Sequence, residues 1–420
     1  MCHILDLPPE IVIWVFESLE NIDDALHFAR SCKYAFSAFD SNSVRLKIFR
    51  SIITNASQHQ HDLELNQAVH MHGHFSSEFY TTPIIPGNAA RRRWHLNMLE
   101  PLRYGTSIPD EVVWDIVARW HGMRLLFVIY LDKATMEAYV GSVFSFTPGV
   151  NEPDTTEESA FEGDIPKPSP NPESCENRTI PASRQASYER FYKALTAQWM
   201  SIERLWRVRS QVWPNAQKFD DAFDATLRQW INNPGRPMKE KIDIAEIVEF
   251  VWGFLGRKTI RFSEFSSWLE GEDDLVRDQY LDQDESKVGN WGFFIRSIVQ
   301  FLRPPQILQL VLSYWYPSSW NFDRSGFLRH LGLFDTWEGV LINAPPSPRS
   351  DSWVSLDIVN YDVGNSFAHM ENGKEVEENW QNYRQTLWSK EIKGKLFLEG
   401  IPERDILCKV TGGAACPQGF

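Results

Sequence analysis

Hydrophobic residues near the start of the chain follow one another without a break. Ile11 to Phe16 are all apolar, and they stand directly after Pro8-Pro9-Glu10. Proline is tolerated in the first turn of a helix, and a glutamate there faces the positive end of the helix dipole, so this stretch predicts a helix. Such a helix is apolar all round, and the side that does not face its own core needs cover. Because Ile and Val also favour strands, a buried strand or a plain helical hairpin is the alternative.

Two further short helices are predicted after this run. Polar residues from Asn21 to Asp24 break the hydrophobic pattern and can cap a helix over residues 25–30. Ser31 can start a third helix, whose apolar residues are Tyr34, Phe36 and Phe39. Three such helices occupy about 40 residues, close to the lower limit for an independent core. We therefore expect this unit to rest on a neighbour, on a partner or on both.

Apolar residues recur at helical spacing in much of the remaining chain. The predicted helices cover 44–53, 110–131, 188–206, 219–231, 244–255, 293–301, 306–316 and 375–388. Gly122 is a candidate break in the second of these, and residues 125–131 fit a buried strand equally well. Short alternating stretches near 354–358 and 396–398 also fit strands. The pattern as a whole predicts a mainly α-helical protein with an irregular, aromatic-rich helical domain.

Residues 151–186 differ from their surroundings in composition. This segment contains six prolines, eight acidic residues and three basic residues, and very few large apolar ones. It cannot bury enough apolar surface to offset the entropy of ordering it, so it predicts a disordered acidic insertion. The resulting layout has five parts, which are a first module over 1–55, a helical connector over 56–150, the insertion over 151–186, a helical domain over 187–345 and an irregular C-terminal region over 346–420.

The bulk composition of the 420 residues narrows the choice of partners and compartment. A formal charge of −14 argues against general binding to nucleic acid or to anionic membranes. The five cysteines are scattered and odd in number, which is typical of a reducing compartment and not of a disulfide scaffold. The N-terminal residues lack the apolar core of a signal peptide, and no apolar run approaches the length of about 20 residues that spans a bilayer. We therefore expect an intracellular protein of the cytoplasm, the nucleus or both.

Candidate chemistry is sparse along the chain. The histidines at 59, 61, 70, 72 and 74 alternate in a way that can chelate a transition metal, but no cysteine or carboxylate completes a site, and a solvated loop is the simpler interpretation. Arg91–Arg93 could meet a phosphate or an acidic partner, although such a run is more often a solvated helix start. The acidic stretch 270–285 leads into the start of a calcium loop at Asp282, but Lys287 replaces its essential glycine. No phosphate loop, zinc motif or nucleophile elbow is present, so we expect no enzyme, no cofactor and no metal site.

Residues of the first module also resemble the F-box. Leu7-Pro8-x-Glu10-Ile11-Val12, Val15-Phe16-x-x-Leu19, Asp24-Ala25-Leu26 and Cys32-Lys33 follow in the order of that motif and at close to its spacing. The familiar tryptophan or leucine after the Cys-Lys pair is replaced, with Tyr34 or Phe36 standing in for it. The resemblance covers little more than residues 5–39, and the remaining chain is similar only in style to F-box proteins of filamentous fungi.

The resemblance implies a protein that binds other proteins and catalyses no reaction itself. An F-box module docks on a Skp-type linker subunit and through it joins a cullin–RING (SCF) ubiquitin ligase, where the chain would act as the substrate receptor that holds a target protein near the transfer site. The residues it implies for the binding face or its support are Leu7, Pro8, Glu10, Ile11, Val15, Leu19, Cys32 and Lys33. The alternatives are a scaffold that binds the linker without delivering a target, and an unrecognised enzyme in the helical domain.

Overall fold

The structure, a computed structural model, describes residues 7–69, 107–132, 134–136, 138–139, 165–167, 182–210, 215–230, 236, 238–259 and 302–318. Within these ranges the chain is helical or irregular and contains no strand. This confirms the prediction of a mainly α-helical protein. The helices predicted over 293–301 and 375–388, and the strands near 354–358 and 396–398, lie outside the described residues. The chain divides into two compact units, Met1–Arg124 and Leu125–Phe420, and the boundary falls inside one helix, α7.

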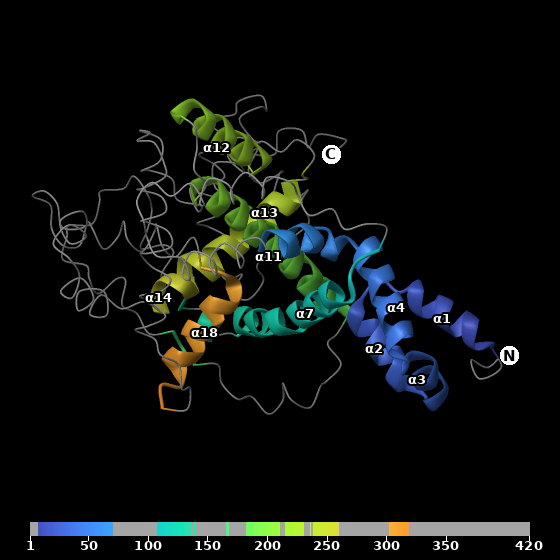
Figure 1. The fold of residues 1–420 in the computed structure, drawn as a ribbon. Coiled ribbons are helices and arrows are strands. Elements are labelled where there is room, and N and C mark those ends of the chain that lie inside the picture. The colour runs from blue at the N-terminus through green and yellow to red at the C-terminus, as the bar shows by residue number, and fades with distance from the viewer. Residues whose placement is uncertain are drawn as a thin grey trace, which may run out of the picture. The chain divides into compact units, whose positions relative to one another are not determined.

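The first unit begins with four helices and a short 3₁₀ turn. These are α1 (Pro9–Glu17), α2 (Ile22–Ser31), α3 (Lys33–Phe39), α4 (Asn42–Asn55) and η2 (Ser57–His59), followed by helical residues 62–69 and the first part of α7 (Asp110–Leu131). Residues 11–16 are helical, so the alternative of a buried strand is excluded. The four helices gather in one bundle (Figure 1), in which α2 packs on α3 and α1 packs on α4. The first unit therefore extends beyond the 1–55 module.

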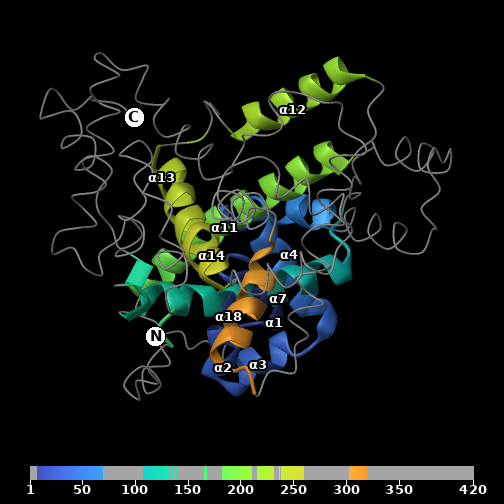
Figure 2. The ribbon, with the colours of Figure 1, turned by 90° about the vertical axis from the view of Figure 1, so that its left-hand side faces the viewer.

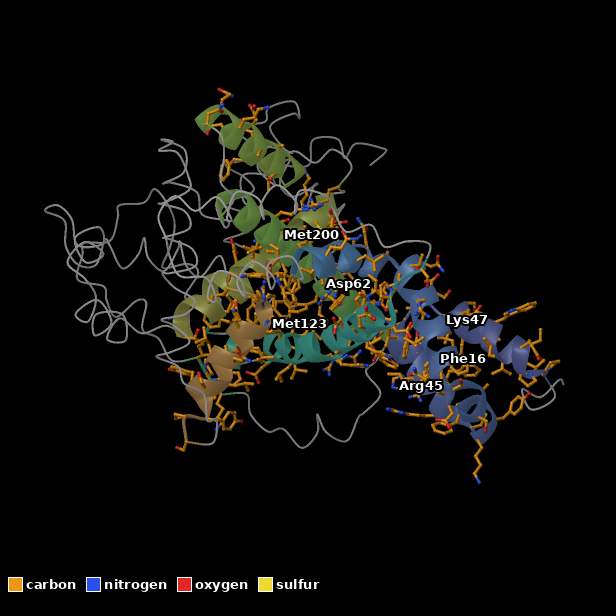
Figure 3. The ribbon with its side chains drawn as sticks, in the orientation of Figure 1. Phe16, Arg45, Lys47, Asp62, Met123 and Met200 are labelled. Carbon is orange, nitrogen blue, oxygen red and sulfur yellow. The ribbon has the colours of Figure 1, made fainter. Side chains whose placement is uncertain are left out.

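Aromatic rings form the core of the first unit. Phe16, which lies inside the bundle (Figure 3), is fully buried and stacks on Phe39 with ring centroids 5.2 Å apart. Phe39 meets Phe49 of α4 edge to face at 5.8 Å, and Phe49 meets Trp114 of α7 at 5.7 Å. Edge-to-face and offset ring pairs stabilise a core beyond the area they bury. The chain of rings joins α1, α3, α4 and α7 in one core.

The second unit contains the longer helices. They are α11 (Ala182–Ser210), α12 (Ala216–Trp230), α13 (Met238–Ile247), the π-helix η3 (Val248–Gly256), α14 (Arg257–Thr259) and α18 (Pro304–Trp315). α11 packs against both α12 and α13, and α18 packs against η3 and α14 (Figure 2). α11 begins five residues before the predicted restart at Ser187. The predicted insertion therefore overlaps the start of this helix, and it also overlaps the described residues 165–167.

Tyrosines and phenylalanines fill the core of the second unit. Tyr130 of α7 packs on Phe191 and Phe250, and Tyr139 packs on Phe250 and Phe254 of η3. The Tyr130 hydroxyl donates to Glu246 Oε1 at 3.2 Å. Burial and the nearby Glu246 carboxylate raise the pKa of Tyr130 well above its usual value, so this hydroxyl stays a donor at neutral pH.

Helix α7 runs without interruption from Asp110 to Leu131. Gly122 does not break it, and residues 125–131 are helical where a strand was the alternative. Hydrophobic residues recur here every three or four positions, so they form one apolar side of a helix that can face the core. A single glycine costs a helix interior only about 1 kcal/mol, which the burial of the flanking residues exceeds.

Candidate partner-binding surface

Helix α1 has one buried side and one exposed apolar side. Val12 and Phe16 are fully buried against the other helices of the bundle. Ile11, Trp14 and Val15 are spaced by three and four residues, so they share the opposite side of the helix. Trp14 is 62% exposed and Val15 is 37% exposed. This is the arrangement expected of a helix whose sequence is apolar all round and whose own unit covers only half of it.

α3 also exposes an apolar side chain. Phe36 is 51% exposed, whereas Ala35 and Phe39 of the same helix are buried. α3 packs on α1, and the Tyr34 hydroxyl donates to the carbonyl of Leu7, just before α1 begins. α1 and α3 are therefore held together, and each presents a large aromatic side chain to solvent. Large exposed apolar side chains that gather on one face of a soluble protein are candidates for an interaction surface.

Local hydrogen bonds fix where α2 and α3 begin. Asn21 is extended and its Oδ1 accepts from the backbone N–H of Asp23 at 2.7 Å, which caps α2. Cys32 caps α3 in the same way, with its Sγ accepting from the backbone N–H of Ala35 at 3.4 Å. Capping residues satisfy N–H groups that the first turn of a helix leaves unpaired. The short connection between α2 and α3 is therefore set by Cys32, one of the residues that the F-box resemblance indicates.

The far end of α1 is held by α4 and the turn after it. Lys47 of α4, which Figure 3 labels, forms an ion pair with Glu17 at 2.7 Å. Ser51 Oγ donates to the Glu17 carbonyl at 3.0 Å, and Gln58 Nε2 donates to the Glu20 carbonyl at 2.5 Å. The first of these bonds pairs a carbonyl of the last turn of α1, and the second pairs a carbonyl in the segment that follows the helix. They hold the exposed side of α1 in one orientation.

The eight residues indicated by the F-box resemblance all retain some solvent exposure. Pro8, Glu10, Val15 and Lys33 are exposed, while Leu7, Ile11, Leu19 and Cys32 are partly buried. Leu7, Pro8, Glu10, Ile11 and Val15 lie on α1 or directly before it, and Leu19 follows it. Cys32 and Lys33 lie at the start of α3, and the bond between Tyr34 and Leu7 brings that helix to the N-terminal end of α1. The structure thus places the residues on two neighbouring helices of one unit.

Sequence reasoning did not include the two most exposed aromatic residues of the module in this set. Trp14 stands inside the apolar run that predicted α1, and its spacing from Ile11 and Ser18 places it on the exposed side. Phe36 was predicted as an apolar residue of the third helix and as a stand-in for the tryptophan or leucine of the motif, with no side of the helix assigned to it. The signal that could have found both is the helix period, because Val12 and Phe16 on α1, and Ala35 and Phe39 on α3, define buried sides that exclude them.

Behind this surface, α7 holds a buried carboxylate of α2. Trp120 Nε1 donates to Asp23 Oδ2 at 2.9 Å, and Arg124 forms an ion pair with the same oxygen. Asp23 is almost completely buried and belongs to the first turn of α2, where a negative charge also meets the helix dipole. The neighbouring His121 lies 4.0 Å from Asp23. Burial lowers the pKa of His121, the cations Arg124 and Arg30 lower it further, and Asp23 opposes both effects.

A second buried carboxylate is held in the same manner. Asp62, labelled in Figure 3, is fully buried and lies 2.7 Å from His59 Nδ1 and 2.8 Å from Arg119 Nη1 of α7. The His59 ring packs against Trp120 with centroids 5.1 Å apart. Buried charges are retained in proteins when they are paired and hydrogen-bonded, as both carboxylates are here. α7 therefore stabilises the helical bundle to which α1 and α3 belong.

The described residues offer no constellation that holds a metal. No group of three or more histidine, cysteine, aspartate or glutamate side chains in this part of the chain could bind one. His59 and His61 are buried within the first unit. His70, His72, His74, Arg91–Arg93 and the acidic stretch 270–285 lie outside the described residues.

Comparison of the chain with protein-family models, with curated proteins and with solved structures finds no match. Among the helices that the structure describes, none is both long enough and apolar enough to cross a membrane.

Proposed function

We propose that this chain is a substrate-receptor subunit of an SCF-type cullin–RING ubiquitin ligase, and that α1 and α3 dock on a Skp-type linker subunit. The observation that carries the proposal is the exposure of Trp14, Val15 and Phe36 on a unit whose sequence resembles the F-box. Exposed aromatic residues near the centre of a patch are the usual anchors of protein interfaces. The small size of the three-helix module agrees with this, since it presents apolar surface that its own core does not need.

The rigid presentation of these residues also supports the proposal. Cys32 and Asn21 fix the helix starts, Tyr34 joins α3 to Leu7, and the far end of α1 is hydrogen-bonded to α4 and η2. An interface that is preorganised in this way loses little entropy when its partner binds. The polar rim that such an interface needs is provided by exposed residues next to the apolar ones, among them Glu10 and Lys33.

The test is capture of a Skp-type linker subunit by the full chain and by a variant with Trp14→Ala and Phe36→Ala. Both side chains are largely exposed, so we expect each replacement to change the free energy of unfolding by less than about 0.5 kcal/mol. Removing an aromatic anchor from an interface costs about 2 kcal/mol or more, which is about 30-fold in affinity per residue. Calorimetric titration with the purified linker subunit measures the affinities, and urea denaturation measures the stability.

Val128→Ala is the matched control, because Val128 is 55% exposed but lies in the second unit. We expect it to leave the affinity for the linker subunit unchanged. A second variant, Leu7→Ala with Pro8→Ala, tests the residues that open the motif. Undiminished capture by both double variants would contradict the proposal. Proximity labelling in cells treated with a proteasome inhibitor then separates a receptor from a scaffold, since only a receptor has a neighbour that accumulates in ubiquitylated form.

A further inference from the structure

A short non-helical segment of the second unit contacts the C-terminal end of α18. We call this segment, Ile165–Lys167, the strap. Ile165 is 2% exposed although it belongs to a proline-rich, acidic stretch with few large apolar residues. The Trp315 indole N–H donates to the Ile165 carbonyl at 3.0 Å. One buried side chain and one well-formed hydrogen bond therefore anchor the strap.

Lys167 interacts with the end of the helix itself. Its ammonium group lies 3.7 Å from the centroid of the Tyr316 ring and 3.5 Å from the Trp315 carbonyl. α18 has no basic residue in its own last turn, where a cation is favourable because of the helix dipole. The strap supplies that cation from 148 residues away in sequence. The aromatic ring and the carbonyl together select a positively charged side chain at this position.

The middle residue of the strap suits an extended ligand. Proline has no N–H to satisfy, and its fixed φ favours an extended backbone, so little entropy is lost when it binds. The carbonyl of Pro166 lies 3.5 Å from the Thr135 hydroxyl oxygen, whose single proton has a nearer acceptor in Asp132 Oδ1 at 3.0 Å. This third contact is weak. The chemistry that holds the strap is therefore a sequence of an apolar residue, a proline and a cation.

We propose that Thr135, Trp315 and Tyr316 form a recognition site for an extended peptide of the form apolar–proline–basic, and that the strap occupies this site as an internal competitor. The partner is a protein with such a segment, which binds when it displaces the strap. One of the strap's contacts favours such an exchange, because Lys167 and Tyr316 are both solvent-exposed and a competing peptide can reach their interaction from outside. The inference does not depend on the proposed function, since all of its residues lie in the second unit.

Weak contacts are sufficient to keep the strap in its site, because the strap and the site belong to the same chain. A tethered segment has an effective concentration of about 1 mM. With an intrinsic dissociation constant of about 0.1 mM, the strap would fill its site about 90% of the time, and an outside peptide would bind about tenfold more weakly than to an empty site. A partner overcomes this difference with a few additional contacts.

The experiment uses a fluorescent synthetic peptide with the sequence of residues 161–170, added to the full chain. In a released variant, Ile165→Asp with Lys167→Glu, the strap loses both its apolar anchor and its cation. We expect this variant to bind the peptide at least about tenfold more tightly than the unmodified chain, as measured by fluorescence anisotropy. Adding Trp315→Phe to the released variant keeps an aromatic ring but removes the N–H donor, and should weaken peptide binding again.

Three controls keep the result interpretable. A peptide that carries the same two replacements should not bind the released variant. Lys218→Glu changes the charge of an exposed lysine on α12 and should leave peptide binding as in the unmodified chain. Lys167→Glu alone, which preserves the buried Ile165, should give a smaller gain of about threefold if the double replacement prevents folding. Equal binding of the peptide to the unmodified chain and to every folded strap variant would show that residues 165–167 are ordinary packing and would overturn the proposal.

Discussion

Single buried charges set the architecture of the first unit. Asp23 and Asp62 are both nearly inaccessible to solvent, and each is paired with an arginine of α7, Arg124 and Arg119 respectively. A buried ion pair contributes little relative to an apolar pair of similar volume, but removing one partner is costly because the other is left uncompensated. We therefore expect these carboxylates to fix the position of the first part of α7 more specifically than apolar contacts would.

Asp23→Asn tests this view at the residue scale. The replacement keeps the shape of the side chain and removes the charge that Arg124 and the Trp120 N–H face. Breaking a buried pair costs about 3–5 kcal/mol, and because the Arg124 side chain is 23% exposed we expect about 2 kcal/mol after allowing for its hydration. Asp24→Asn is the matched control, since Asp24 is exposed in the same first turn and should cost less than about 1 kcal/mol. Equal losses in urea denaturation would contradict a special role for Asp23.

At the scale of the elements, the sequence predicts where the helices lie, but it predicts only in part which side of each helix faces solvent. The apolar run from Ile11 to Phe16, the polar break at Asn21 and the periodic residues of α7 all indicate helices, because local spacing and capping carry that information. A run that is apolar all round does not say which side faces the core, and this is why Trp14 was absent from the expected site. The apolar residues predicted for the third helix likewise had no side assigned, and the buried Ala35 and Phe39 now place Phe36 on the exposed side of α3.

Other elements depend on contacts that are distant in sequence. The π-helix over Val248–Gly256 follows α13 directly, and no residue type in that stretch indicates a π-helical turn in place of an α-helical one. The strap lies inside a segment whose composition predicts disorder, but burial of the Ile165 side chain and the hydrogen bond from Trp315 to its carbonyl hold it in place. The partners of Asp23 are 97 and 101 residues away. Local patterning cannot reveal such pairs, because they arise from the fold as a whole.

Replacement of Gly122 tests how much a single glycine destabilises helix α7. This glycine is exposed in the helix interior, and a Cβ added to it would have no atom within 4 Å. Gly122→Ala should therefore stabilise the protein by about 0.5–1 kcal/mol, since alanine loses less backbone entropy in a helix than glycine does. Ala118→Gly, one turn earlier on the same exposed side, should lower stability by a similar amount. Thermal unfolding followed by circular dichroism measures both changes, and a destabilising Gly122→Ala would indicate that this face of α7 is not open.

At the scale of the molecule, the question is how much chain the F-box-like module needs in order to fold. The helices α1 to α4 bury Asp23 and Phe49 only with the help of α7, through Trp120 and Trp114. The first 55 residues alone would leave the Asp23 carboxylate and the Phe49 ring without their partners on α7, in a unit already near the lower size limit for an independent core. The whole first unit, residues 1–124, contains those partners.

We therefore expect the fragment 1–124 to unfold cooperatively in urea and the fragment 1–55 to show no cooperative transition. Complementation makes the reason testable, because a synthetic peptide of residues 107–124 should restore a cooperative transition when it is added to the fragment 1–69. The same peptide with Trp120→Ala and Arg124→Ala should not, since both replacements remove the groups that Asp23 faces. If the fragment 1–55 instead folds cooperatively by itself, the apolar surface of α1 and α3 needs no support from α7, and the buried pairs only attach the module to the chain that follows it. A cooperative transition with the doubly replaced peptide would likewise mean that the contacts it retains, among them the Phe49–Trp114 ring pair and the Asp62–Arg119 ion pair, are sufficient.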